Sequence, residues 1–272
     1  MMGSVGNLLR TGMYYSMPRL AFRLHQMRHH HDEIEMDLLP ALVDPEREAV
    51  DVGANIGRYT LPLSRLARHV HAFEPHPRLA YVLSAALGEN VSVHQVVVSD
   101  EPGVLALATP IVDGKPSEGI SRIGGFNEKV PLSELSVEAV TLDELADRPI
   151  GFIKIDVEGH ELNVLEGARK LIDAQQPIIL IEVEERHRPQ AIASVRSFME
   201  AKNYDGFFVH SGRMNPIEDL KEEMQDDKLL QAIESGQDRR TVPYVNNFIF
   251  IPEQAHISEI LNSADMILAE RR

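Results

Sequence analysis

A glycine-containing turn followed by one carboxylate is the part of the sequence best suited to chemistry. The turn is Asp51-Val-Gly-Ala-Asn-Ile-Gly57, and Glu74 follows it by 17 residues. Gly53 and Gly57 allow backbone conformations closed to most residues, and Asn55 is among the few others that tolerate the left-handed region. A carboxylate at the end of the next strand can accept hydrogen bonds from both hydroxyls of a ribose. The pattern therefore predicts an adenosine site.

The spacing of the glycines discriminates between ligands that contain adenosine. Dinucleotide enzymes normally carry G-x-G-x-x-G, and a P-loop needs Gly-Lys-Ser or Gly-Lys-Thr, so that backbone amides can bind phosphates. Here the turn is G-x-x-x-G, and no Gly-Lys-Ser or Gly-Lys-Thr occurs. S-adenosylmethionine has no phosphate, so the turn favours it. A nicotinamide dinucleotide and a purely structural glycine turn are the alternatives.

Four further residues are assigned to the cofactor site from their positions. Asp51 opens the turn, and Tyr59 and Thr60 begin the following helix, where backbone amides and the helix dipole favour a carboxylate of the ligand. Asp100, after the third strand, is placed to bond an adenine amino group. It is also a common turn residue before Glu-Pro-Gly.

A second polar cluster is expected where a later strand runs into a helix, in Lys154-Ile-Asp-Val-Glu-Gly-His-Glu161. Alternate strand residues share a face, so Lys154 and Asp156 point the same way. Asp156 ends the strand at the carboxyl edge, where open α/β sheets bind ligands. For Lys154, an ion pair with Asp156 or Glu182 is as good a reading as a catalytic role.

Carboxylates near this edge also raise the question of a metal. Asp156, Glu158, Glu182 and Glu184 are oxygen ligands of the kind that Mg²⁺ prefers. Mg²⁺ is a possible cofactor that we do not favour, and no metal ligand is assigned.

The elements that must position these residues alternate between strands and helices. Short β-rich runs at 49–52, 70–73, 91–98, 152–156, 178–183 and 245–251 are separated by stretches with helical spacing. This alternation predicts an α/β fold with a doubly wound, mostly parallel sheet. Residues 104–141 break the rhythm and are read as a hairpin or loop insertion, and the charge-rich segment 211–240 as a lid-like excursion.

Composition excludes several classes of protein. The chain has 272 residues, 43% of them hydrophobic, with 27 basic and 42 acidic residues and a formal net charge of −15. This charge argues against a nucleic-acid partner. No apolar run approaches the ~18 residues of a membrane span. The absence of cysteine excludes disulfides and thiolate metal sites and suits a reducing compartment, so we predict a cytoplasmic location.

The first 31 residues differ from the rest in charge. They contain Arg10, Arg19, Arg23 and Arg28 and no acid. A basic amphipathic arm of this kind is typical of a contact with a partner subunit, as in a homodimer, or with an anionic membrane surface. A helical arm packed on its own domain is the alternative.

Several separate motifs together resemble the FkbM family of S-adenosylmethionine-dependent methyltransferases, over roughly residues 45–251. The motifs are Val50–Thr60, Phe73–Pro75, Thr141–Leu145, Phe152–Glu161, Val164–Ala168 and Asn247–Ile251. The resemblance implies a class I methyltransferase fold: a Rossmann-like, seven-stranded mixed sheet whose last strand is antiparallel. It also implies O-methylation of a hydroxyl on a saccharide, a glycolipid precursor or a secondary metabolite.

The order of the motifs gives the expected organisation, and the catalytic assignment is drawn from the placement of the residues alone. We expect an N-terminal helical arm at 1–44, the methyltransferase domain at 45–252 and a C-terminal helix at 253–272. A sugar hydroxyl is a poor nucleophile, so a general base is expected. We predict Asp156 or His160 as this base, with Glu182 orienting the acceptor. An NAD-dependent oxidoreductase and a non-catalytic scaffold with the cofactor fold are the alternatives.

Overall fold

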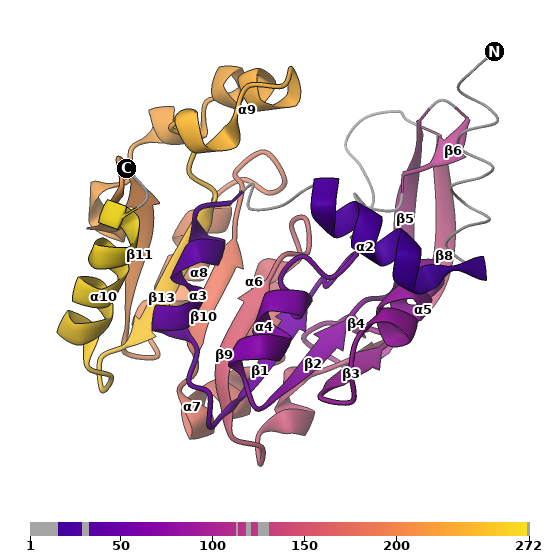
Figure 1. Cartoon of the computed structure of the whole chain (residues 1–272), viewed down its shortest axis with the longest axis horizontal. Coiled ribbons are helices and arrows are strands. Elements are labelled where there is room, and N and C mark those ends of the chain that lie inside the picture. Colours follow the sequence, from indigo (N-terminus) through magenta and orange to yellow (C-terminus); the bar gives the residue numbers. More distant parts are fainter. Residues whose placement is uncertain (1–15, 29–32, 113, 118–120, 125–130, 271–272) are drawn as a thin grey trace.

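The computed structural model describes residues 16–28, 33–112, 114–117, 121–124 and 131–270, and it contains two sheets (Figure 1). The larger sheet has eight strands in the order β12-β11-β13-β10-β9-β1-β2-β3. These strands are β1 (Glu48–Val52), β2 (His69–Phe73), β3 (Val91–His94), β9 (Ile150–Ile155), β10 (Ile178–Glu182), β11 (Tyr204–His210), β12 (Arg213–Pro216) and β13 (Asn247–Pro252).

The topology confirms the Rossmann-like class and changes the expected number of strands. Strands β3, β2, β1, β9 and β10 are parallel, and β13 is antiparallel to both β10 and β11. The sheet has eight strands rather than seven because β12 folds back on β11 as an antiparallel neighbour. The strand expected at 91–98 is also divided: β3 ends at His94, and Val97–Val98 forms β4 in the second sheet.

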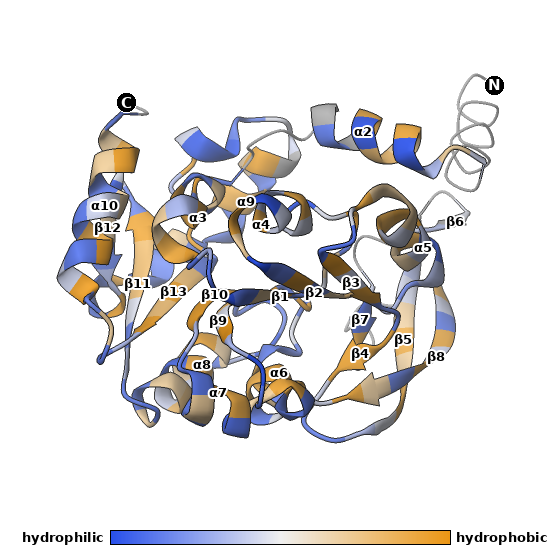
Figure 2. Cartoon of the chain, turned by 60° about the horizontal axis from the view of Figure 1, so that its bottom comes forward, coloured by the Kyte–Doolittle hydropathy of each residue, from blue (hydrophilic) through white to orange (hydrophobic). Residues whose placement is uncertain are grey.

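Helices cover both faces of the large sheet, as Figure 2 shows. One face packs against α3 (Glu35–Leu42), α4 (Thr60–Leu66), α5 (Pro77–Ala86) and α10 (Ile257–Glu270). The other packs against α6 (Glu161–Glu166), α7 (Arg169–Gln175) and α8 (Ala191–Glu200). Because both faces are covered, the central strands β1 and β9 are buried along their whole length.

Side-chain alternation along β9 determines which groups enter each layer. Ile153 and Ile155 belong to the core beneath α6, α7 and α8. Phe152 belongs to the core on the opposite face, with Leu38 of α3 and Leu63 of α4. Lys154 shares the side of Phe152, so its side chain enters the layer of α3 and α4 and is fully buried.

The smaller sheet is built from residues 97–140. Its strands are β4 (Val97–Val98), β5 (Gly103–Val112), β6 (Lys115–Pro116), β7 (Arg122–Ile123) and β8 (Leu132–Val140). β5 and β8 form a long antiparallel pair, and β4 joins β8 in parallel. Leu107, Val137 and Ala139 form a small core of their own with Val97.

Two further segments bring helices to the large sheet. The arm contributes α2 (Pro18–Arg28), which packs on α5, and the chain then continues into α3. The segment after β11 contains β12, several short 3-10 turns and α9 (Asp227–Glu234) before β13 begins. Among the described helices, none is long and apolar enough to cross a lipid bilayer.

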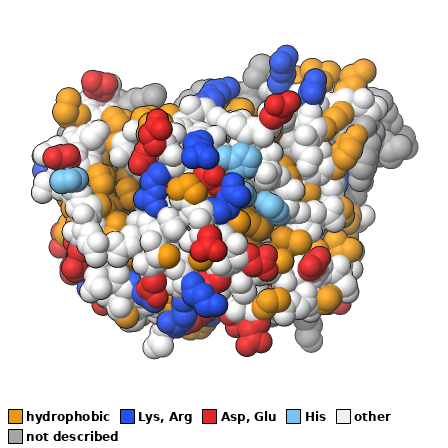
Figure 3. Space-filling view, turned by 90° about the horizontal axis from the view of Figure 1, so that it is seen from below, with side chains coloured by type: hydrophobic (Ala, Val, Ile, Leu, Met, Phe, Trp, Pro, Cys, Tyr) orange, Lys and Arg blue, Asp and Glu red, His pale blue; other side chains and the backbone are white. Residues whose placement is uncertain are grey.

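The amino ends of the strands carry an ionic network. Glu48, the first residue of β1, is buried and accepts hydrogen bonds from Arg148 Nε at 2.7 Å and Arg148 Nη2 at 3.0 Å. His71 Nε2 lies 3.0 Å from the same carboxylate, and His71 Nδ1 lies 3.4 Å from His94 Nε2. On the molecular surface, basic, acidic and histidine side chains are interspersed over the face seen from below (Figure 3).

Candidate functional site

The glycine turn lies at the carboxyl end of β1 and packs closely against the end of β9. Gly53 has a φ of +79°, and a Cβ at this position would lie 1.8 Å from the carbonyl oxygen of Asp156. Only glycine fits there, because both the dihedral and the contact exclude a side chain. The amides of Gly53 and Ala54 donate to the carbonyl of Phe73 at 3.0 Å, so the turn is fastened to β2 as well.

Glu74, directly after β2, is buried and held by two backbone amides. Asn55 N–H donates to Glu74 Oε2 at 2.7 Å, and His76 N–H donates to Glu74 Oε1 at 2.7 Å. Asn55 has a φ of 49°, which turns its amide toward the carboxylate. These two bonds use one oxygen each and fix the direction of the carboxylate.

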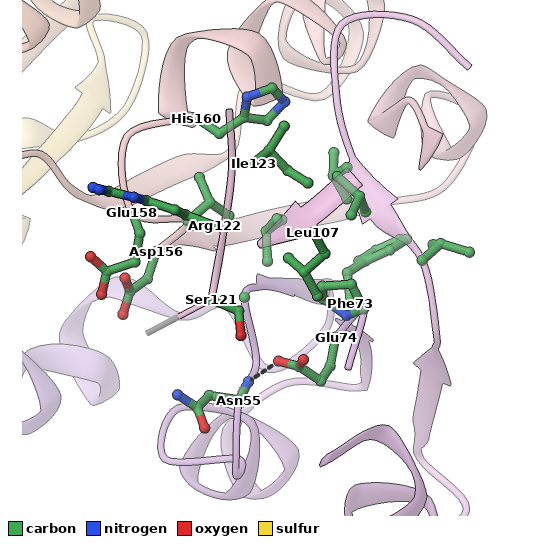
Figure 4. A pocket seen from close by; sticks show the side chains of 17 residues that line it. Asn55, Phe73, Glu74, Leu107, Ser121, Arg122, Ile123, Asp156, Glu158 and His160 are labelled. Carbon is green, nitrogen blue, oxygen red and sulfur yellow. Dashed lines mark hydrogen bonds between the residues drawn. The ribbon is translucent and has the colours of Figure 1, made fainter. Parts of the chain in front are cut away.

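Gly53, Asn55 and Glu74 line one hollow together with Asp156, Glu158 and His160 (Figure 4). The hollow has a volume of about 670 Å³, including the part open to solvent. Two groups of residues that are a hundred positions apart in the sequence are thus brought together at the carboxyl edge of the sheet.

One wall of this hollow is apolar and comes from the smaller sheet. Leu107 of β5 and Ile123 of β7 line it with Val97 of β4, and Phe73 of β2 lines the same hollow. These residues were absent from the sequence-based assignment, because the segment 104–141 has no clear periodicity. Figure 4 shows this wall facing the side on which Asp156 and Glu158 lie.

Two carboxyl groups on the acidic side of the hollow have raised pKa values. Burial raises the pKa of Asp156, and the positive charge of Lys154 opposes this rise. Burial and the charge of Asp156 raise the pKa of Glu158 to about 8. Glu158 Oε2 also lies 3.1 Å from His187 Nε2. Shifted carboxylates in a hollow are typical of functional sites.

His160 also lines the hollow, and Asp100 lies beside it. Burial lowers the pKa of His160, whose Nε2 is 2.9 Å from Ser99 Oγ. Ser99 Oγ and Asn163 Nδ2 donate to Asp100 Oδ1 at 2.8 and 3.1 Å. These bonds lower the pKa of Asp100, with the Asn163 bond the larger cause. Asp100 itself is not among the residues that line the hollow.

Four other residues assigned to the cofactor lie outside the lining of the hollow. A Cβ on Gly57 would meet Leu83 at 2.6 Å and Phe22 at 3.0 Å, so Gly57 allows α2 and α5 to pack against the turn. Thr60 Oγ1 donates to Asp51 Oδ2 at 2.6 Å, and both side chains are buried. Burial raises the pKa of Asp51 to about 6. The fourth residue, Tyr59, belongs to a separate cluster.

The buried cluster around Tyr59 includes a carboxylate that sequence reasoning missed. Tyr59 OH donates to Glu33 Oε2 at 2.7 Å, and Lys154 Nζ lies 5.0 Å from the centre of the Tyr59 ring. Lys154 Nζ also donates to the carbonyl of Ile155 at 3.2 Å and to Asn247 Oδ1 at 3.4 Å. Burial raises the pKa of Glu33, but Lys154 and Arg58 outweigh it, so the net shift is downward. No local pattern marks Glu33, which precedes α3.

Glu182 ends β10 on the far side of this cluster and does not line the hollow. Asn246 Nδ2 donates to Glu182 Oε1 at 2.6 Å and to Glu184 Oε1 at 3.2 Å. Burial, with the charge of Asp156, raises the pKa of Glu182 well above its ordinary value. Burial also raises the pKa of Glu184, but bonds from Arg186 and Tyr244 outweigh it and bring the pKa to about 2.

A second hollow lies at the same edge of the sheet, beyond Glu182. Its polar lining includes Glu35, His210, Arg239, Arg240, Tyr244 and Asn246. Asn247 pairs with Glu182 at the end of β10, which places the preceding residues at the carboxyl edge. Asn246 therefore separates this hollow from Glu182. Within the residues that the structure describes, no group of three or more acidic or histidine side chains is arranged to hold a metal ion.

Comparison with known proteins identifies related methyltransferases. Hexuronic acid methyltransferase AglP of Haloferax volcanii is 26% identical over 213 residues, which cover 71% of this chain and 81% of that protein. The FkbM methyltransferase structure from Methylobacillus flagellatus has 18% identity and a TM-score of 0.49, covering 76% of this chain and 44% of the other. An rRNA methylase structure from Streptococcus thermophilus has 15% identity and a TM-score of 0.43, covering 81% of this chain and 95% of the other.

A family model described as the methyltransferase FkbM domain matches residues 51–205. This match includes the glycine turn, Glu74 and the segment from Lys154 to Glu161. It also spans the whole smaller sheet. The chain belongs to the FkbM methyltransferase family.

Proposed function

We propose that this methyltransferase uses S-adenosylmethionine and methylates a hydroxyl oxygen of a saccharide, a glycolipid precursor or a secondary metabolite. The observation that carries the proposal is that Glu74 and Asp156 line the same hollow. One carboxylate suits a ribose and the other suits an acceptor proton, so donor and acceptor groups would meet at the carboxyl edge of the sheet.

The residues of the hollow fit the donor. Glu74 is fixed by the amides of Asn55 and His76, so its carboxylate is oriented before a ligand binds. The apolar wall of Leu107 and Ile123 suits the faces of an adenine ring. Gly53 keeps the turn close to the end of β9. When bound, S-adenosylmethionine supplies a methyl group on a positively charged sulfur.

Asp156 is the general base in this proposal. The acceptor oxygen loses its proton as it becomes bonded to the methyl group, and a carboxylate at the edge of β9 can take this proton. Burial raises the pKa of Asp156, which makes it a stronger base than an exposed aspartate. His160 is the alternative base, and its bond to Ser99 Oγ holds the imidazole at the hollow.

Alignment of the bound donor and acceptor is expected to contribute more to the rate than the general base does. Alignment of two bound reactants lowers a barrier by roughly 7–11 kcal/mol, whereas a general base adds about 10²–10⁴-fold to the rate.

The second hollow offers a place where an acceptor can be held. Glu182 lines neither hollow, but it accepts a hydrogen bond of 2.6 Å from Asn246 Nδ2, and Asn246 lines the second hollow, so Glu182 would orient the acceptor through Asn246.

The nature of the acceptor rests on the relative and on the lining of the second hollow. AglP is named as a hexuronic acid methyltransferase, which supports a sugar hydroxyl as the acceptor. Arginine, histidine, tyrosine and asparagine side chains line the second hollow, and these groups hydrogen-bond the hydroxyls and carboxylates of sugars. We therefore place saccharides first among the acceptors to be tested.

Calorimetry followed by a methyl-transfer assay tests the proposal. Titration of the full chain with S-adenosylmethionine and, separately, with NAD should give binding of the methyl donor only. Methyl transfer should then be measured with uronic acids, neutral sugars and glycolipid precursors as acceptors. Preferential binding of NAD would favour an oxidoreductase. Donor binding without turnover on any acceptor in the panel would favour a non-catalytic scaffold.

A further inference from the structure

Apolar side chains are exposed where the arm packs on α5. Among the described residues, six large apolar side chains are exposed, and three of them lie here: Met17 at 57%, Leu20 at 46% and Tyr81 at 46%. Met17 and Leu20 also border a shallow hollow that reaches Ala85 of α5. Clustered apolar exposure of this kind marks a contact surface, whereas single exposed residues need no explanation.

Helix α2 has an inner and an outer face. Ala21 and Phe22 are buried against the body of the protein, and Gln26 Nε2 donates to the carbonyl of Ile56 at 3.1 Å. Leu20 and Arg23 are exposed on the outer side. The helix is therefore fastened along one side and presents a mixture of leucine and arginine along the other. Figure 2 shows α2 at the margin of the molecule.

The N-terminal sequence that contains α2 has a charge opposite to that of the rest of the chain, and the described part of this surface carries Arg19 and Arg23. Residues 1–31 contain four arginines and no acid, although the formal net charge of the protein is −15. A negatively charged surface repels most of this protein and attracts the arm. Exposed leucine and methionine beside arginine is the combination that binds the interface of an anionic bilayer.

A second copy of the chain fits this surface less well than an anionic membrane does. A symmetric dimer through α2 would bring the same surface of each copy together. Arg19 and Arg23 of both copies would then lie in one interface, and residues 1–31 contain no acid to neutralise them. An anionic bilayer neutralises these arginines and covers the apolar side chains at the same time.

We propose that the outer face of α2, together with Tyr81 of α5, binds the surface of a membrane that contains anionic lipids. The binding is peripheral, because no described helix can span a bilayer. Gln26 links α2 to the glycine turn, so the bound membrane would lie near the cofactor hollow. The proposal does not depend on the identity of the methyl acceptor.

Vesicle flotation of the full chain, without donor or acceptor, tests this proposal. Vesicles of phosphatidylcholine alone are compared with vesicles that also contain phosphatidylglycerol, at low and high salt. The wild-type protein should float with the anionic vesicles, and high salt should weaken this binding. Arg23→Gln should reduce the partition coefficient about fivefold, and Leu20→Ser should reduce it at both salt concentrations.

Two matched variants provide the controls. Arg213→Gln and Met266→Ser alter an exposed arginine of β12 and an exposed methionine of α10, away from α2. They should bind vesicles as the wild type does, and circular dichroism should show that all four variants are folded. Equal binding to both vesicle types, or equal loss in the control variants, would overturn the proposal. A dimer that Leu20→Ser dissociates, without vesicle binding by the wild type, would also overturn it.

Discussion

The backbone amide of Asn55 and the carboxylate of Glu74 form a hydrogen bond of 2.7 Å that joins the glycine turn to the end of β2. The carbonyl of Phe73, which accepts from the amides of Gly53 and Ala54, joins the same two elements. It orients the carboxylate toward the hollow and fixes the turn in one conformation. The two residues that the sequence singled out most clearly therefore act as one unit.

Glu74→Gln should weaken donor binding by one to two orders of magnitude. A hydrogen bond to a charged group contributes roughly 1.5–3 kcal/mol, and a glutamine retains only one of the two acceptor oxygens. Calorimetric titration with S-adenosylmethionine measures the change. Glu89→Gln, at an exposed loop position, is the matched control and should bind normally. Unchanged affinity in Glu74→Gln would contradict the ribose assignment.

Gly53→Ala should destabilise the protein by several kcal/mol. The new Cβ would lie 1.8 Å from the carbonyl oxygen of Asp156, at a φ of +79° that alanine disfavours. A left-handed conformation costs roughly 1–2 kcal/mol, and overpacking adds about 1–3 kcal/mol. In Gly88→Ala the nearest atom would be Asn90 Oδ1 at 3.5 Å, so little change is expected. Urea denaturation of both variants compares them, and equal midpoints would refute the close packing.

The sequence predicted this part of the molecule well because its information is local. The strand before Gly53, the glycine turn and the helix after it follow one another within twenty residues, and each has its own period or turn residue. Glu74 was predictable for the same reason, since it ends the next strand. The parallel pairing of β1 with β2 then places the two ends side by side.

Contacts made over long distances in the sequence were not predictable in this way. Glu33 reaches Tyr59 from the residues just before α3, and Leu107 reaches the hollow from β5. Neither residue belongs to a periodic pattern that points to the site. Tyr59 was expected to meet the ligand because it begins a helix, but its hydroxyl is bonded to Glu33. Tertiary packing determines which residues meet at such positions, and the hydrophobic pattern of a single helix or strand does not reveal these contacts.

Asp156→Asn should lower kcat by about 10²–10⁴-fold if Asp156 is the base, with little effect on donor affinity. A base must be deprotonated, so kcat should rise with pH. Because burial raises the pKa of Asp156, this rise should occur at higher pH than for an exposed aspartate. The rise should disappear in Asp156→Asn.

Glu158→Gln is the comparison that separates the two neighbouring carboxyl groups. Glu158 has a pKa raised to about 8, so a base at this position would give a rise of kcat near pH 8. Because the proposed base is Asp156, Glu158→Gln should retain most of the turnover and the pH profile of the wild type. Near-normal turnover in Asp156→Asn would remove Asp156 from the base role.

The network around Glu48 should make stability depend on pH in two ranges. Burial lowers the pKa of His71 and His94, so protonation is disfavoured in the folded protein and stability falls as the pH drops below 6.5. The bonds from Arg148 lower the pKa of Glu48 from 4.5 to about 2, so its contribution is present above pH 4.5 and is lost as the pH falls toward 2. Urea midpoints measured across this range should show both losses.

Glu48→Gln isolates the lower range. This substitution should destabilise the protein at pH 7 by roughly 2 kcal/mol, because it removes a charged partner of Arg148 and His71. It should also flatten the loss of stability below pH 4.5. Glu46→Gln, at an exposed position two residues earlier, should leave the pH dependence unchanged. An equal slope in Glu48→Gln and the wild type would show that Glu48 does not titrate as described.

His210→Ala should raise the KM for the acceptor and leave the Kd for the donor unchanged. His210 ends β11 and lines the second hollow, which lies beyond Glu182 from the donor. Loss of one hydrogen bond to the acceptor would raise KM by about threefold to tenfold. His256→Ala, at a side chain that is 86% exposed, is the control. A change in donor affinity alone, or an unchanged KM, would show that the acceptor is bound outside this hollow.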